Sequence, residues 1–348
     1  MKNLWGPVRA LVVAAAGAGL VLGAGRYPGT VELRTPTERQ ALPAPKAAVL
    51  TDARLVCPGP EPVGIDLVRS VSGTTALTAV TPPAVAMPPG IPSQTAGGTL
   101  TMGGLGGSTL ATTPVAPSRQ RPALSTVTLP AAIADNPLGV IVAGTGDGAP
   151  GLAGLQTWTR LDGDDRGFAA AACQRPTSDM WLLGGGGEAS RRERLIIANP
   201  GAAPIEVSVA VLGAKGPISP DHPTVVAVPP ESRTAVLVDA LAPNESAPAV
   251  HLTTPVGEFT AWLNDAWIEG ATPRGTDDAG PSAPPATRLV IPGIDLTTTA
   301  GVTARAVLRL AAVGEGAVVQ LSTITEAGSA PLAKNAVVMV PASGTIDV

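Results

Sequence analysis

The chain is poor in aromatic, charged, cysteine and histidine residues. Of its 348 residues, 2% are aromatic and 14% are charged, with two cysteines and two histidines. The separated His222 and His251 cannot supply a histidine-rich metal cluster, and no G-x-S-x-G motif accompanies them to indicate a serine hydrolase. The 23 basic and 27 acidic residues give a net charge of −4, which argues against a basic face for nucleic acid. The sequence therefore predicts no cofactor, no metal, no nucleic-acid partner and no catalytic residue.

Only one long apolar run is present, and it lies at the N-terminus. Lys2 and Arg9 precede the uncharged residues 10–25, and Arg26 restores charge. A basic start followed by a short apolar core is typical of an export signal, and an uncleaved membrane anchor remains the alternative. We therefore predict a signal peptide or membrane anchor at 1–26, a linker at 27–52 and an extracytoplasmic protein, either membrane-anchored or secreted.

Glycine and proline, in contrast, are abundant, with 41 and 37 residues. Proline inside a helix removes a hydrogen bond and clashes with the preceding turn, so this composition suits short strands joined by turns. Residues 205–211 alternate apolar and more polar side chains, the pattern of a half-buried strand. The predicted fold class is all-β, with tandem immunoglobulin-like β-sandwich repeats behind the N-terminal helix.

A short pattern, an arginine followed by aliphatic residues, occurs at Arg54, Arg194 and Arg305. Recurrence at a long period indicates tandem modules, and equating these strands sets the domain boundaries. The predicted units are repeat one at 53–176 with a low-complexity insertion at 81–122, a linker at 177–193, repeat two at 194–285 and a partial repeat three at 286–348. Repeat three either packs against repeat two or continues in chain further downstream.

The two cysteines fall at the opening strand and just beyond the last strand of repeat one. An even number of cysteines in an exported chain favours a disulfide between Cys57 and Cys173. Two unrelated buried thiols are the alternative.

Two glycine-rich motifs are candidate ligand sites. Residues 146–151 satisfy G-x-G-x-x-G, but the following residues read as a strand rather than the helix that a dinucleotide site needs, which favours a hairpin loop. Residues 184–187 are four glycines, followed by Arg191, Arg192 and Arg194. This stretch reads either as a flexible linker or as a contact for an anion or an anionic polymer.

The remaining candidates are acidic and aromatic. The acidic residues expected in loops that close repeats one and two are Asp162, Asp164, Asp165, Asp277 and Asp278, and their spacing falls short of a calcium loop. The tryptophans considered are Trp158, Trp181, Trp262 and Trp267. Packing in the core is expected of them, and stacking on sugars is the alternative.

The basic-apolar start, RLVCPGP at 54–60, Cys173, the stretch from Trp181 through GGGG to RRERLIIANPG, and AWLND with TPRGTD resemble one family. The chain is similar, over nearly its whole length, to exported actinobacterial proteins grouped as domain of unknown function 5719. The resemblance implies a cell-envelope protein and transfers no catalytic residue. The chain departs from the family in ending within its third repeat.

Three functional hypotheses follow. The first is a non-enzymatic scaffold or interaction module of the cell envelope, whose partner is cell-wall polysaccharide or another envelope protein. The second is an accessory protein of cell-wall biogenesis that binds glycan or anionic polymer through the tryptophans or the arginines. The third is an envelope hydrolase that uses aspartate carboxylates.

Overall fold

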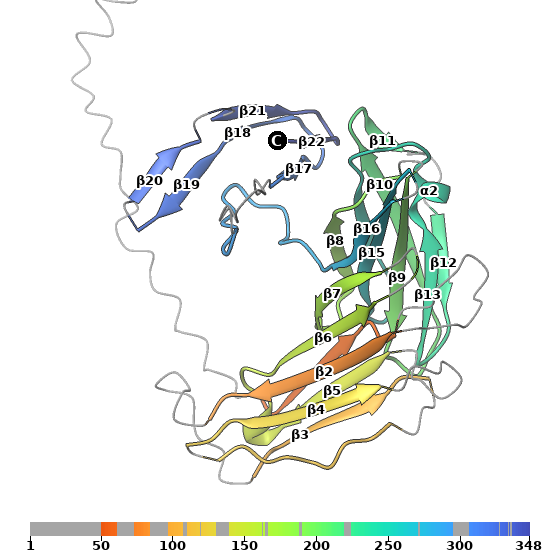
Figure 1. The fold of residues 1–348 in the computed structure, drawn as a ribbon, viewed down its shortest axis with the longest axis vertical. Helices are drawn as coiled ribbons and strands as arrows, with labels where there is room; N and C mark the ends of the chain where they lie inside the picture. The colour runs from red at the N-terminus through yellow and green to blue at the C-terminus, as the bar shows by residue number, and fades with distance from the viewer. Residues whose placement is uncertain are drawn as a thin grey trace, which may run out of the picture. The chain divides into compact units, whose positions relative to one another are not determined.

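A computed structural model describes residues 50–60, 73–83, 97–106, 110–118, 120–129, 139–161, 163, 166–187, 190–218, 224–270, 272–294, 306–326, 328–332, 334 and 336–348. Its regular structure is almost entirely antiparallel β-sheet (Figure 1), which confirms the all-β prediction. The chain from Val49 to Val348 forms one compact unit. We divide it into a first region (50–176), a second region (177–294) and a third region (306–348).

The first region contains two antiparallel sheets that share a core. The smaller sheet has the order β1 (Asp52–Cys57), β5 (Val140–Thr145), β3 (Thr99–Gly104). The larger has the order β4 (Ala123–Leu129), β2 (Thr74–Thr81), β6 (Ala153–Arg160), β7 (Gly167–Ala172). Every second side chain of β2 is buried, because successive side chains of a strand point to opposite faces of the sheet.

The second region also contains two sheets. The first has the order β11 (Gly216–Ile218), β10 (Ile205–Gly213), β14 (Ala249–Thr253), β8 (Asp179–Leu183), and β12 (Thr224–Val228) also pairs with β10. The second has the order β13 (Ser232–Leu237), β9 (Arg191–Asn199), β15 (Thr260–Glu269), β16 (Thr272–Ala279). One turn of helix, α2 (Val238–Leu241), follows β13.

The first and second regions pair their strands in the same order. The strand order β1-β5-β3 in the first region corresponds to β8-β14-β10 in the second. The strand order β4-β2-β6-β7 in the first region corresponds to β13-β9-β15-β16 in the second. The strand that contains Arg54, β1, therefore corresponds to β8 and not to the Arg194 strand, β9, with which the sequence pattern equated it. The pattern was misleading because an aliphatic run describes any buried strand, whichever its place in a sheet.

This correspondence changes how two segments of the chain are assigned, because each contains a core strand. The predicted linker 177–193 contains β8, whose Met180 and Leu182 are buried in the second core. The predicted low-complexity insertion 81–122 contains β3, whose Leu100 and Met102 are buried in the first. Both strands are short and bounded by glycine or proline, so composition concealed their alternation.

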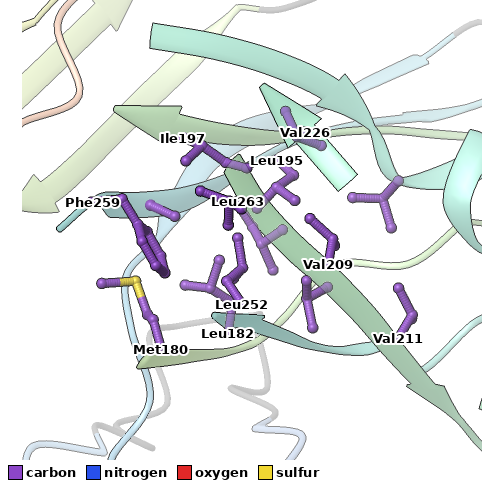
Figure 2. Close-up of a cluster of buried hydrophobic side chains, with 14 of the residues drawn as sticks. Met180, Leu182, Leu195, Ile197, Val209, Val211, Val226, Leu252, Phe259 and Leu263 are labelled. Carbon is purple, nitrogen blue, oxygen red and sulfur yellow. The ribbon is translucent and has the colours of Figure 1, made fainter. Parts of the chain in front are cut away.

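The core of the second region lies between its two sheets (Figure 2). The side chains labelled there are Met180, Leu182, Leu195, Ile197, Val209, Val211, Val226, Leu252, Phe259 and Leu263. They come from strands of both sheets, and Phe259 immediately precedes β15. Burial of these branched and aromatic side chains supplies the region's main stabilisation.

The third region is a series of nested antiparallel pairs. They are β17 (Arg309–Ala311) with β22 (Thr345–Asp347), β18 (Ala317–Gln320) with β21 (Val337–Val340), and β19 (Ser322–Thr325) with β20 (Gly328–Pro331). A two-stranded ribbon is marginally stable alone. The β17–β22 pair of the third region contacts the second region. Ala311 packs beside Trp181, and the Thr345 hydroxyl donates a hydrogen bond to the Ala247 carbonyl at 2.6 Å.

The predicted signal or anchor at 1–26 and most of the predicted linker 27–52 lie outside the described residues. Within the described part of the chain, no helix has both the length and the apolar character needed to cross a membrane.

Candidate functional site

Cys57 and Cys173 form a disulfide, as the sequence predicts. The bond joins the end of β1 to the residue that follows β7, across 116 positions of sequence. Gly154 lies against it, because a Cβ at this position would come within 2.9 Å of the Cys173 sulfur. The backbone continues the connection, since Val56 and Gln174 exchange two N–H···O=C bonds of 2.8 Å.

The residues beside both cysteines also hold the second region. Val56 and Ala171 are buried in one apolar cluster with Ile196 and Trp262. This cluster combines the outer face of the small first-region sheet with the outer face of the β9–β15 sheet. The disulfide therefore lies directly behind the junction between the two regions.

Polar bonds complete this junction. The Trp262 indole N–H donates to the Ala172 carbonyl at 3.3 Å. The Arg233 guanidinium, from β13, donates to the carbonyls of Pro58 and Pro60. Both acceptor segments directly flank the disulfide, so its position and the position of the second region are coupled.

A cleft of about 460 Å³ opens beside the disulfide. Its apolar walls include Leu55 and Leu152 from the first region and Met180, Trp181 and Pro281 from the second. Ser282 lies in the same cleft, and its backbone N–H donates to the Trp181 carbonyl at 2.8 Å. Mixed apolar and polar clefts of a few hundred Å³ are the usual binding sites of small ligands and short peptide segments.

Most polar side chains at the rim bond within the protein. His251 Nε2 and Asp179 Oδ2 are 3.1 Å apart, and the His251 ring stacks on Trp181 with centroids 4.1 Å apart. The Thr177 hydroxyl donates to the Asp179 carbonyl at 3.1 Å. Arg175 differs, because its side chain is exposed and has no hydrogen-bond or ion-pair partner among the described residues.

A second polar group is buried inside the second region. Glu193 on β9 lies opposite Asp265 on β15, and the side chain of Glu193 is only 3% exposed. Burial, reinforced by the nearby Asp265 carboxylate, raises the pKa of Glu193 to about 8. Burial also raises the pKa of Asp265, although Arg191 opposes the rise through an ion pair of 2.9 Å. At neutral pH Glu193 is therefore mostly protonated.

The tetraglycine segment 184–187 covers this buried group. Gly185 has φ +56°, and a Cβ there would overlap the Glu193 carboxylate. Its carbonyls face a cation, because Arg309 Nη1 from the third region donates to Gly184 and Gly185 at 2.7 and 2.9 Å. A phosphate cradle presents backbone N–H groups instead, so these carbonyls bind an internal arginine.

The three arginines predicted to contact an anion do not share one face. Because side chains alternate along β9, Arg191 lies on the face of Glu193 and Leu195, and Arg192 and Arg194 lie on the other. Arg191 pairs with Asp265 and lies 5.5 Å from the centre of the Trp267 ring. Arg194 is only 6% exposed, which removes it from reach of an external polymer.

The acidic candidates are also separated. Asp162, Asp164 and Asp165 lie outside the described residues. Asp277 and Asp278 belong to β16 rather than to a loop. Asp278 accepts a bond from Asn264 at 2.8 Å, and burial raises its pKa to about 6. Among the described residues, no group of three or more histidine, cysteine or acidic side chains could hold a metal ion.

The remaining candidates are the G-x-G-x-x-G motif, the tryptophans and His222. Residues 146–148 form the 3-10 turn η3, and the strand β6 follows it instead of the helix that a dinucleotide site needs. The predicted hairpin loop is wrong, because β5 and β6 belong to different sheets and the turn connects one sheet to the other. Three of the four tryptophans considered are buried, and Trp267 is 41% exposed. His222 lies outside the described residues.

Sequence reasoning missed the cleft and the Glu193 group. Glu193 did carry a signal, because it stands two residues before Leu195 and four before Ile197, on the face that alternation sends into the core. Asp179 and His251 carried none, since they meet only through the pairing of β8 with β14. Arg175 carried none either, because only the fold of the loop before β8 brings it to the cleft.

Comparison with curated proteins gives no match. A family model matches residues 127–348, which begin within β4 and include Cys173, the second region and the third region, but not Cys57. The match covers well over half of the chain. The chain belongs to the family of unknown function DUF5719.

Proposed function

We propose that the chain acts outside the cytoplasm as a non-enzymatic scaffold or interaction module of the cell envelope. The observation that carries this proposal is the disulfide at the junction between the first and second regions. Disulfides persist in oxidising compartments and are rare in the reducing cytosol. A cross-link behind a buried junction makes a rigid pair of modules, which suits a protein that positions a partner.

The charged groups support a structural rather than a chemical role. The carboxyl groups of Glu193 and Asp278, whose pKa values rise most, are at most 8% exposed. Catalytic acids and bases must reach substrate, and these side chains are enclosed between sheets. The cleft beside the disulfide is instead the accessible surface on which we place the partner.

The glycan-binding alternative receives less support from the tryptophans. Sugar stacking needs an accessible ring face, whereas Trp158, Trp181 and Trp262 are at most 7% exposed. The exposed Trp267 has the Arg191 guanidinium over its ring, 5.5 Å from the ring centre. The signal peptide or membrane anchor predicted at 1–26 remains part of the proposal.

The test is the location and thiol state of the full chain in cells that naturally make it. Free thiols are alkylated at lysis, the peptides with Cys57 and Cys173 are mapped by mass spectrometry, and intact cells are treated with protease. We expect a disulfide-linked peptide pair and a chain that external protease degrades. Two alkylated cysteines in a protease-protected chain would contradict the proposal.

A further inference from the structure

We propose that the cleft beside the disulfide binds a short peptide segment of a partner protein in which a carboxylate neighbours apolar side chains. This inference rests on the proposed role as an interaction module and names the ligand class of its cleft. Its components are the apolar walls formed by both regions and the guanidinium of Arg175, which has no hydrogen-bond or ion-pair partner among the described residues.

Arg175 is the basic side chain of the cleft, whose acidic side chain, Asp179, bonds to His251. Three other polar side chains of the cleft bond within the protein: Asp179 bonds to His251, Thr177 to the Asp179 carbonyl and Gln174 to the Ala172 carbonyl. Arg175 follows Gln174, whose backbone is fixed by Val56, so the base of its side chain is anchored. An anchored arginine that no described side chain or carbonyl engages is complementary to an anion, and its planar fork suits a carboxylate.

The walls determine the body of the ligand. Leu55, Leu152, Met180 and the proline residues 281 and 284 offer no hydrogen-bonding side chain. A sugar would place several hydroxyl groups against them without partners, which is costly. Leucine-like side chains next to the carboxylate would instead gain from burial there. The observations therefore favour a peptide over an acidic glycan.

The experiment titrates the full chain with four probes by isothermal calorimetry. Two carry the carboxylate from different sources, acetyl-leucyl-aspartyl-leucinamide on a side chain and acetyl-leucyl-leucyl-leucine at the C-terminus. Acetyl-leucyl-asparaginyl-leucinamide is the neutral counterpart, and oligogalacturonate represents acidic glycans. We expect at least one carboxylate peptide to bind about tenfold or more tightly than the neutral peptide, and the better of the two identifies the carboxylate source.

Two variants link that binding to the cleft. Arg175→Ala should weaken the carboxylate peptide about tenfold, to the level of the neutral one. Ser282→Trp should abolish binding by filling the cleft while leaving Arg175 in place. Arg121→Ala is the matched control, because Arg121 is an exposed arginine away from the cleft, and it should bind as the unmodified chain does. Circular dichroism confirms that each variant is folded.

Three results would overturn the inference. They are equal binding of the charged and neutral peptides, tighter binding of oligogalacturonate than of either carboxylate peptide, and no peptide binding at millimolar concentration. None depends on the cellular location of the protein. A chain that proves cytoplasmic and reduced would refute the proposed function without affecting this titration of the oxidised protein.

Discussion

The first and second regions pair their strands in the same order, yet they are stabilised differently. In the first, the end of β1 is joined covalently to the segment after β7 by Cys57 and Cys173. In the second, the corresponding strand β8 is joined to the segment after β16 by a backbone hydrogen bond from Ser282 to Trp181, with no covalent link between them. The first core contains several alanines where the second is built mainly from valine, leucine and isoleucine. The alanine-containing core of the first region buries less apolar area and so contributes less stabilisation. The disulfide stabilises this region in addition.

Their buried polar groups differ as well. In the first region Gln156 is 1% exposed, and its amide exchanges two bonds of 2.8 Å with the backbone of Gly59. In the second region Glu193 occupies a similarly buried place and can ionise. A neutral, fully bonded amide is insensitive to pH, whereas a buried carboxyl group is not. The comparison predicts a first region sensitive to reduction and a second region sensitive to alkali.

The largest expected effect is removal of the disulfide. The double variant Cys57→Ala, Cys173→Ala should lose about 4–5 kcal/mol of unfolding free energy, since the bond closes a loop of more than one hundred residues. Denaturant titration measures the loss, and hydrogen exchange should place it first in β1, β5 and β3. Equal loss of protection in the β8–β14–β10 sheet would mean that the two regions unfold as one.

The next effect is that of pH on the second region. The pKa of Glu193, about 8 in the folded chain, lies above its ordinary value of 4.5, so between these values the folded chain holds a proton that the unfolded chain has released. The free energy of unfolding therefore falls as pH rises from about 4.5 to 8, by an amount on the order of 4 kcal/mol. Asp278 acts with the same sign between 3.8 and about 6.

Glu193→Gln tests this directly. Glutamine reproduces the size of the protonated side chain and cannot ionise, so the variant should keep its stability above pH 6, where the unmodified chain loses it. Thermal melts at pH 5, 7 and 8.5 measure the difference. Glu206→Gln is the control, because Glu206 is an exposed glutamate on β10. Parallel pH profiles for the chain with and without Glu193 would refute the assignment.

A smaller effect concerns the junction of the second and third regions. Arg309 donates to Gly184 and Gly185 and pairs with Asp347 at 2.8 Å, so Arg309→Met should weaken the attachment of β17 and β22 by about 2 kcal/mol. Limited proteolysis and hydrogen exchange of residues 306–348 measure it. Arg288→Met, in an exposed extended segment, should have no effect, and an equal change in both variants would exclude Arg309 as the attachment.

The smallest effect separates two buried tryptophans. Trp262→Phe removes the bond to the Ala172 carbonyl and should cost about 1 kcal/mol more than Trp158→Phe. The Trp158 indole N–H is buried with no hydrogen-bond partner among the described residues, so its removal loses no bond. Urea titrations of both variants give the difference. Equal costs would show that the indole bond does not stabilise the junction.

Much of the architecture could be predicted from particular residues. Alternation in residues 205–211 correctly indicated β10, and the positions of Cys57 and Cys173 correctly indicated their bond. Strand equivalence could not be predicted from pattern, because β1 and β9 share an arginine and an aliphatic run but occupy different sheets. The same limit concealed β3 and β8, which are too short for their periodicity to stand out.

Local sequence alone determined the all-β class, the family and the pairing of the cysteines, because composition, turn residues and cysteine count act without reference to distant contacts. Tertiary structure alone decided that Arg191, Arg192 and Arg194 lie on two faces, that Arg309 binds the tetraglycine carbonyls, and that Arg175 lines a cleft beside the disulfide. Those outcomes depend on register between strands far apart in sequence, and a shift of one residue would turn every side chain to the opposite face.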